Sequence, residues 1–71
     1  MSFNKRYINI ENMLRVYKES DLNGLIEYIT KPDALIISTK DNSKYIINAI
    51  NKGDLFGVKL IINYELQNNK Y

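Results

Sequence analysis

The sequence repeats its own pattern with a period that constrains the fold more than any other feature. The tetrapeptide Asp-Leu-x-Gly begins at position 21 and again at position 54, which is 33 residues later. The apolar residues around the two copies also correspond: Met13 with Ile46, Leu25 with Val58, and Ile29 with Ile62. Self-similarity at this spacing is typical of stacked helix-turn-helix repeats, which bury their apolar faces against one another. The sequence therefore predicts two related helical units in a single small domain, residues 1–71.

The first unit, residues 9–31, is expected to contain two helices. Apolar residues recur at helical spacing over residues 10–19 and again over residues 21–30. Asn9 and Ser20 are the expected N-caps, because their side-chain oxygens can accept hydrogen bonds from the free amides of a first turn. The proline that follows ends the second helix, since proline disfavours helical geometry at the residue before it.

The second unit, residues 33–66, supports two interpretations. In the helical one, Ser43 caps a first helix, and Gly53 ends it because glycine takes a positive φ without steric cost. In the other, Ala34–Thr39 and Tyr45–Ile50 form a hairpin, and residues 58–66 add a third strand. β-Branched and aromatic residues favour the strands, whereas the 33-residue register favours the helices.

We therefore expect a mainly α fold of two stacked helix-turn-helix units with an intervening finger loop. The alternative is an α+β fold, in which two N-terminal helices are followed by a three-stranded antiparallel meander. Residues 1–8 are expected to form a polar arm and residues 67–71 a tail.

The second unit resembles the ankyrin repeat, whose unit is a turn-like finger followed by two antiparallel helices. Asp41-Asn42 stands where that family ends its finger, and asparagine suits a position that needs positive φ. Within the stretch that carries the family's Thr-Pro-Leu-His-x-Ala signature, only Ile46 and Ala49 agree. The family's small, turn and core positions match better, at Ala49, Gly53, Leu55, Val58, Leu60 and Ile61. The first unit is similar to an N-terminal ankyrin unit.

The resemblance implies a protein-binding role without catalysis, in which the chain binds or masks a partner protein. Ankyrin-like proteins usually contact partners through the fingers and the first helix of each unit. By position, the implied contact residues are Lys40, Asp41, Ser43 and Tyr45 on the finger, Asn51 and Lys52 at the helix end, and Lys18 and Glu19 in the first unit. A homodimer is also expected, because a two-unit stack leaves an open apolar flank at each end.

Two other functions stay open. The abundance of Ile, Asn, Lys and Tyr, whose codons are rich in A and T, fits bacteria, phages and large DNA viruses. A small phage, viral or mobile-element inhibitor of a host enzyme or defence protein would suit the α+β alternative. A nucleic-acid-associated accessory protein is the third hypothesis.

Composition argues against other classes of function. The chain has no cysteine and no histidine, so it lacks thiolate ligands, disulfides and the commonest general base. No cofactor, metal site or enzymatic activity is expected, because no serine has an activating histidine and no carboxylates pair in an apolar setting. The net charge of +2 is too small to favour nucleic acid. The apolar run Leu60-Ile61-Ile62 is far too short for a membrane span, so a cytoplasmic location is expected, in the host cell if the protein is viral.

Overall fold

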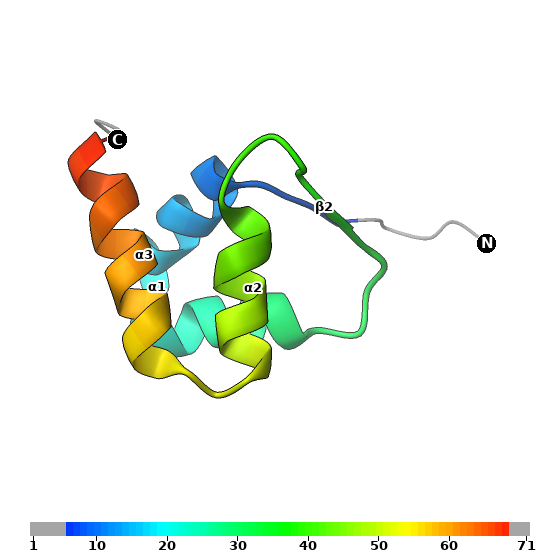
Figure 1. Ribbon diagram of the computed structural model, residues 1–71. Helices are drawn as coiled ribbons and strands as arrows, with labels where there is room; N and C mark the ends of the chain where they lie inside the picture. Colours follow the sequence, from blue (N-terminus) through cyan, green and yellow to red (C-terminus); the bar gives the residue numbers. More distant parts are fainter. Residues whose placement is uncertain (1–5, 69–71) are drawn as a thin grey trace.

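The described part of the chain, residues 6–68 of a computed structural model, contains three helices and two short strands. Their order is β1 (Arg6–Ile8), α1 (Ile10–Thr30), β2 (Leu35–Ile37), α2 (Ser43–Asn51) and α3 (Leu55–Asn68). Helices α2 and α3 lie side by side and antiparallel, with α1 behind them (Figure 1). The prediction of a mainly α fold is confirmed. The alternative meander is wrong, because the segments expected as its second and third strands lie in α2 and α3.

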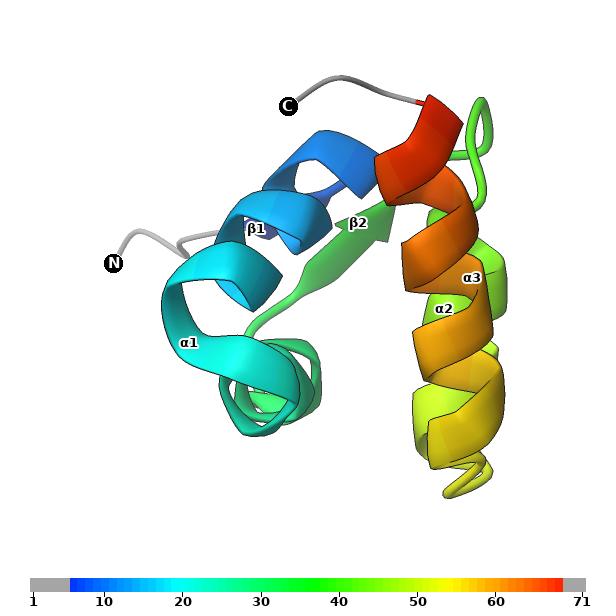
Figure 2. The same cartoon turned by 90° about the vertical axis from the view of Figure 1, so that its left-hand side faces the viewer.

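Helix α1 consists of two helical halves that meet at a sharp bend. Asp21 interrupts the helix with φ of 60° and ψ of −167°, and the two halves run in different directions (Figure 2). Asn9 caps the first half as predicted, since its Oδ1 accepts a hydrogen bond from the Asn12 amide at 2.8 Å. The break falls at Asp21, one residue beyond the expected cap at Ser20.

Helix α2 ends at Gly53 as the sequence predicts. Gly53 has φ of 73°, its amide donates to the Ile50 carbonyl at 3.0 Å, and the Asp54 amide donates to the Ala49 carbonyl at 2.8 Å. This pair of hydrogen bonds is the Schellman arrangement, which satisfies the free carbonyls of a helix end. The Asp54 carboxylate then caps α3, because Oδ1 accepts from the Gly57 amide at 2.9 Å.

The two Asp-Leu-x-Gly copies each begin a helical segment, but the residue with positive φ is Asp21 itself in the first copy and Gly53, directly before the second copy, in the other. In each copy the aspartate precedes a helix, and the glycine three residues later leaves room for a side chain of the turn. A Cβ on Gly57 would lie 2.5 Å from Oδ2 of Asp54, and a Cβ on Gly24 would overlap the Cβ of Ser20. The repeated glycines are therefore explained by close approach.

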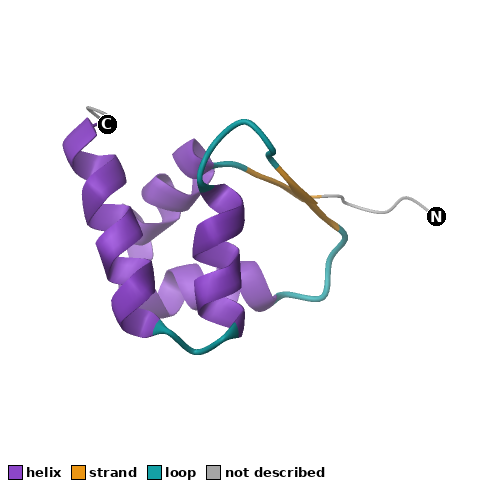
Figure 3. Cartoon of the chain, viewed as in Figure 1, coloured by secondary structure: helices purple, strands orange, loops and turns teal. Residues whose placement is uncertain are grey.

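Strands β1 and β2 form a parallel pair, which corrects two predictions (Figure 3). The Arg6 amide donates to the Ala34 carbonyl at 3.0 Å, and the Ser38 amide donates to the Ile8 carbonyl at 2.9 Å. Residues 6–8 are therefore not a polar arm, and Ile8 is fully buried; residues 1–5 lie outside the described residues. The segment expected as a finger loop contains β2, with α1 as the crossover that parallel strands require.

Arg6 fastens β1 to the C-terminal end of α1. Its guanidinium donates to the Tyr28 carbonyl through Nη1 and to the Lys31 carbonyl through Nη2 at 3.3 Å. Nε lies 3.0 Å from Oδ2 of Asp33, and the guanidinium carbon lies 4.8 Å from the centroid of the Tyr28 ring. A cation at this position is favourable, because the last carbonyls of a helix lack intrahelical donors and carry partial negative charge.

The core between α1 and the α2–α3 pair follows the 33-residue register. Equivalent residues of the two units are buried together: Met13 and Ile46, Leu14 and Ile47, Leu25 and Val58, and Ile29 and Ile62. The two helix pairs therefore bury the same faces, as expected of related units. Helix α3 continues to Asn68, so the predicted tail begins with helical residues, and residues 69–71 lie outside the described part.

Candidate protein-binding groove

Asp41, expected as a finger residue that contacts a partner, links the N-termini of α1 and α2. Its Oδ2 accepts from the Ile10 amide at 3.0 Å, and its Oδ1 accepts from the Ser43 amide at 2.9 Å and from the Ser43 hydroxyl. Burial raises the pKa of Asp41, but these hydrogen bonds together with one from Ser38 outweigh it and hold the pKa below its usual value. Asp41 is therefore a structural link between the two units.

Ser43 is fully buried and is not available to a partner. The prediction that Ser43 caps α2 is also wrong, because the N-cap residue is Asn42 and the Asp41 carboxylate accepts the Ser43 amide in its place. The Asn42 side chain makes no capping hydrogen bond. Its Nδ2 instead donates to Oε2 of Glu65 at 2.6 Å and so joins the start of α2 to α3.

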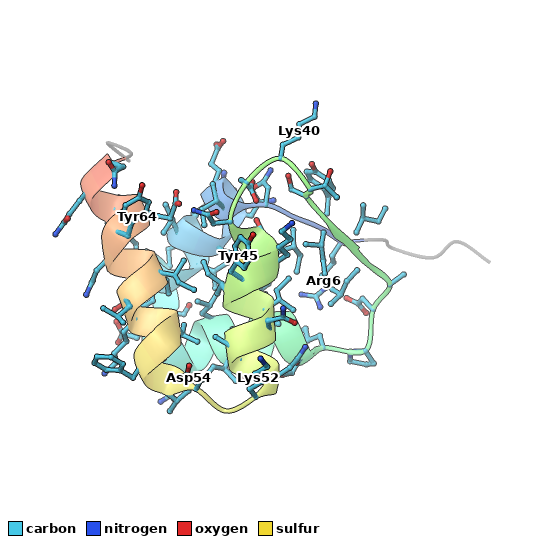
Figure 4. All side chains as sticks on the ribbon, viewed as in Figure 1. Arg6, Lys40, Tyr45, Lys52, Asp54 and Tyr64 are labelled. Atoms are coloured by element: carbon cyan, nitrogen blue, oxygen red, sulfur yellow. The ribbon has the colours of Figure 1, made fainter. Side chains whose placement is uncertain are left out.

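The remaining predicted contact residues are exposed but are not brought together. Lys40 and Tyr45 lie at the start of α2, and Lys52 lies at the opposite end, after Asn51 (Figure 4). Nine helical residues separate these ends by about 13 Å. Lys18 and Glu19 are exposed on the first half of α1. The predicted set therefore does not form one continuous surface.

A groove with a volume of about 360 Å³ lies between α2 and α3. It is lined by Asn42, Tyr45, Leu60, Ile61 and Tyr64. Tyr45, Leu60 and Tyr64 are 52%, 55% and 58% exposed, so the groove presents mainly apolar and aromatic surface to solvent. Of the predicted contact residues, Tyr45 is the one that lines it.

Helix α3 extends this apolar surface beyond the groove. Phe56, Leu60 and Tyr64 recur every four residues and therefore lie along one side of the helix, which we name the outer row of α3. Phe56 is 72% exposed. Contiguous exposed apolar surface marks interaction sites more often than isolated apolar residues do.

The first unit provides an internal comparison for the outer row of α3. The residues 33 positions earlier are Asn23, Glu27 and Lys31, which are all polar and exposed. The first unit folds with polar residues at these positions, so packing does not require apolar ones in the second. Sequence reasoning missed the outer row because it searched for shared apolar positions, although the difference between the units is visible in the sequence.

The described residues hold no group of three or more side chains suited to a metal ion. None of the helices over residues 6–68 is both long and apolar enough to cross a bilayer. Comparison with models of known protein families, with curated proteins and with solved structures finds no match.

Proposed function

We propose that this chain is a non-catalytic protein-binding module of two ankyrin-like helix-turn-helix units, which binds or masks a partner protein at the α2–α3 groove. The supporting observation is the contrast between the apolar outer row of α3 and the polar residues at equivalent positions of the first unit. Masking of a host protein, as by a small phage or viral inhibitor, is one form of this role.

The chemistry of the groove suits protein recognition. Aromatic residues are enriched at the centres of protein interfaces, because they bury a large area at a small cost in side-chain entropy. Tyr45 and Tyr64 in the groove and Phe56 in the outer row of α3 are of this kind, and each lies on a helix, so its backbone is already fixed before binding. A rigid groove with half-exposed aromatic residues is a surface on which a few side chains can contribute most of the binding energy.

The test replaces the outer row with its own equivalents from the first unit. The variant Phe56→Asn, Leu60→Glu, Tyr64→Lys is expected to fold, because residues of these types already occupy the corresponding positions of the first unit and all three side chains are exposed on α3. Tagged wild-type and variant chains are used to capture partners from the native host. Captured proteins are identified by mass spectrometry, purified, and titrated against both chains.

We expect a partner that binds the wild type and loses affinity for the variant by at least about tenfold. Circular dichroism must show the same helix content for both chains. The matched control is Asn23→Ala together with Glu27→Ala on α1, which should leave binding unchanged. A partner that binds the triple variant as tightly as the wild type would refute the groove as the binding site.

A further inference from the structure

We infer that the groove binds an acidic amphipathic helix of the partner protein. This inference rests on the protein-binding function proposed above and specifies the chemistry of the partner. It follows from the charges around the groove and from the spacing of the outer row of α3.

The acidic side chains on the groove side of the molecule are occupied by hydrogen bonds. Residues 35–68 contain three carboxylates. Asp41 accepts from Ile10 and Ser43, Asp54 accepts from the Gly57 amide, and Glu65 accepts from Asn42. These groups are therefore engaged in joining helices or capping them.

The basic side chains of the same region point to solvent. They are Lys40, Lys44, Lys52 and Lys59, all of which are exposed. Nζ of Lys44 lies 5.2 Å from the centroid of the Tyr45 ring, which places a positive charge at the edge of the groove. Lys40 lies at the same end of the molecule as Tyr45 and Tyr64 (Figure 4). A positive charge at the edge of an apolar groove favours a ligand with acidic residues beside its apolar face.

Helix α1 carries the opposite balance of charge. Residues 10–30 hold four acidic side chains (Glu11, Glu19, Asp21 and Glu27) and two basic ones (Arg15 and Lys18), a net charge of −2, whereas residues 35–68 hold four lysines and three carboxylates, a net charge of +1. An acidic partner is therefore attracted to the α2–α3 side and repelled from α1. Charge separation of this kind orients an approaching partner before contact.

The spacing of the outer row favours a helical partner. Phe56, Leu60 and Tyr64 form a row with a period of four residues, and such rows on two helices interdigitate when the helices pack. The row spans about 12 Å along α3, which matches two to three turns of a partner helix. The partner helix would present apolar residues at i, i+3, i+4 and i+7.

The test uses three synthetic peptides of about 15 residues, long enough for partial helix formation in water. The first has Leu and Phe at i, i+3, i+4 and i+7 and Glu on both flanks. The second keeps the apolar residues and replaces each Glu with Lys. The third has the composition of the first in scrambled order. Each is titrated into the full chain, followed by fluorescence anisotropy and by amide chemical shifts.

We expect the first peptide to bind and to shift the signals of Tyr45, Leu60 and Tyr64, and the other two to bind at least about tenfold more weakly. Lys44→Glu should weaken the first peptide by about tenfold at low salt, and less at high salt. Lys31→Glu makes the same charge change directly after α1 and should have little effect.

Each of several results would overturn this inference. Equal or tighter binding of the basic peptide would show that the charge preference is wrong, while the protein-binding proposal would stand on its own capture experiment. Equal binding of the scrambled peptide, or no shift at the groove with any peptide, would exclude an amphipathic helix. A dimer that Leu60→Glu dissociates in sedimentation would show that a second copy covers the face. Single-stranded DNA that shifts the same signals would assign the lysines to nucleic acid.

Discussion

Asp21 holds a backbone conformation that glycine adopts with far less strain, at φ of 60° and ψ of −167°. Such a conformation costs about 1–3 kcal/mol in a residue with a Cβ. Asp21→Gly is therefore expected to raise the free energy of unfolding by about 1 kcal/mol, after the greater chain entropy of glycine offsets part of the gain. Urea denaturation of the two chains measures the change. A less stable variant would show that the aspartate side chain contributes more than the strain costs.

Replacement of Gly53 is expected to have the opposite effect on stability. A Cβ at Gly53 would meet no atom within 4 Å, so any cost of substitution comes from φ of 73° and not from a clash. Gly53→Val is expected to lower the free energy of unfolding by about 2 kcal/mol, because a β-branched residue is disfavoured at positive φ. Gly53→Asn, which tolerates this region, is the matched control and should cost less. An unchanged melting temperature for Gly53→Val would contradict the helix-ending role.

The Arg6 side chain joins two elements, β1 and the C-terminal end of α1. Arg6→Ala removes the hydrogen bonds to the two helix-end carbonyls and the ion pair with Asp33, and we expect a loss of about 2 kcal/mol in the free energy of unfolding. Arg6→Lys should recover only part of this, since lysine keeps the charge but not the planar set of donors. Amide hydrogen exchange at Ser38, whose amide donates to Ile8, should accelerate in Arg6→Ala. Unchanged protection there would show that the strands hold together without Arg6.

The sequence predicts the helices of this fold better than its strands. The helices of the first unit carry a clear amphipathic period, with Asn9 as a recognisable cap, and both appear where expected. Strand β1 was missed because three residues carry little periodic signal and depend on pairing with β2, which is distant in sequence. Residues 58–66 have strand propensity yet form α3, because burial of Val58 and Ile62 against α1 and α2 outweighs it.

The candidate groove was predictable only in part. Tyr45 was found through the family resemblance, whereas Asp41 and Ser43 were assigned to the surface because a loop position in sequence does not reveal burial. Phe56 and Leu60 required a comparison of residues that differ between the units. Apolar residues at helical spacing are normally assigned to the buried face of a helix, so a second apolar row on the same helix is not recognised as exposed from its spacing alone.

At the scale of the whole molecule, Asp41 makes the stability of the two units depend on pH. Its pKa in the folded chain lies below the ordinary value of 3.8, so its contribution to stability is complete above that value and is lost as the pH falls through the folded pKa. Asp41→Asn should lower the free energy of unfolding by about 1–2 kcal/mol at pH 7 and by less under strongly acidic conditions. Urea denaturation at pH 7 and under strongly acidic conditions tests this. The control is Glu19→Gln, which removes an exposed carboxylate. An equal loss at both pH values would show that ionisation of Asp41 is not the cause.

One carboxylate thus accepts amides from the first residues of both α1 and α2. Long repeat arrays can lose a terminal repeat while the others remain folded, because each repeat touches only its neighbours. Here, unfolding of the second half removes the carboxylate to which the Ile10 amide at the start of α1 donates, and both halves also bury their apolar residues in one core. Heat should therefore melt the two halves in one step, with no half-folded species in between.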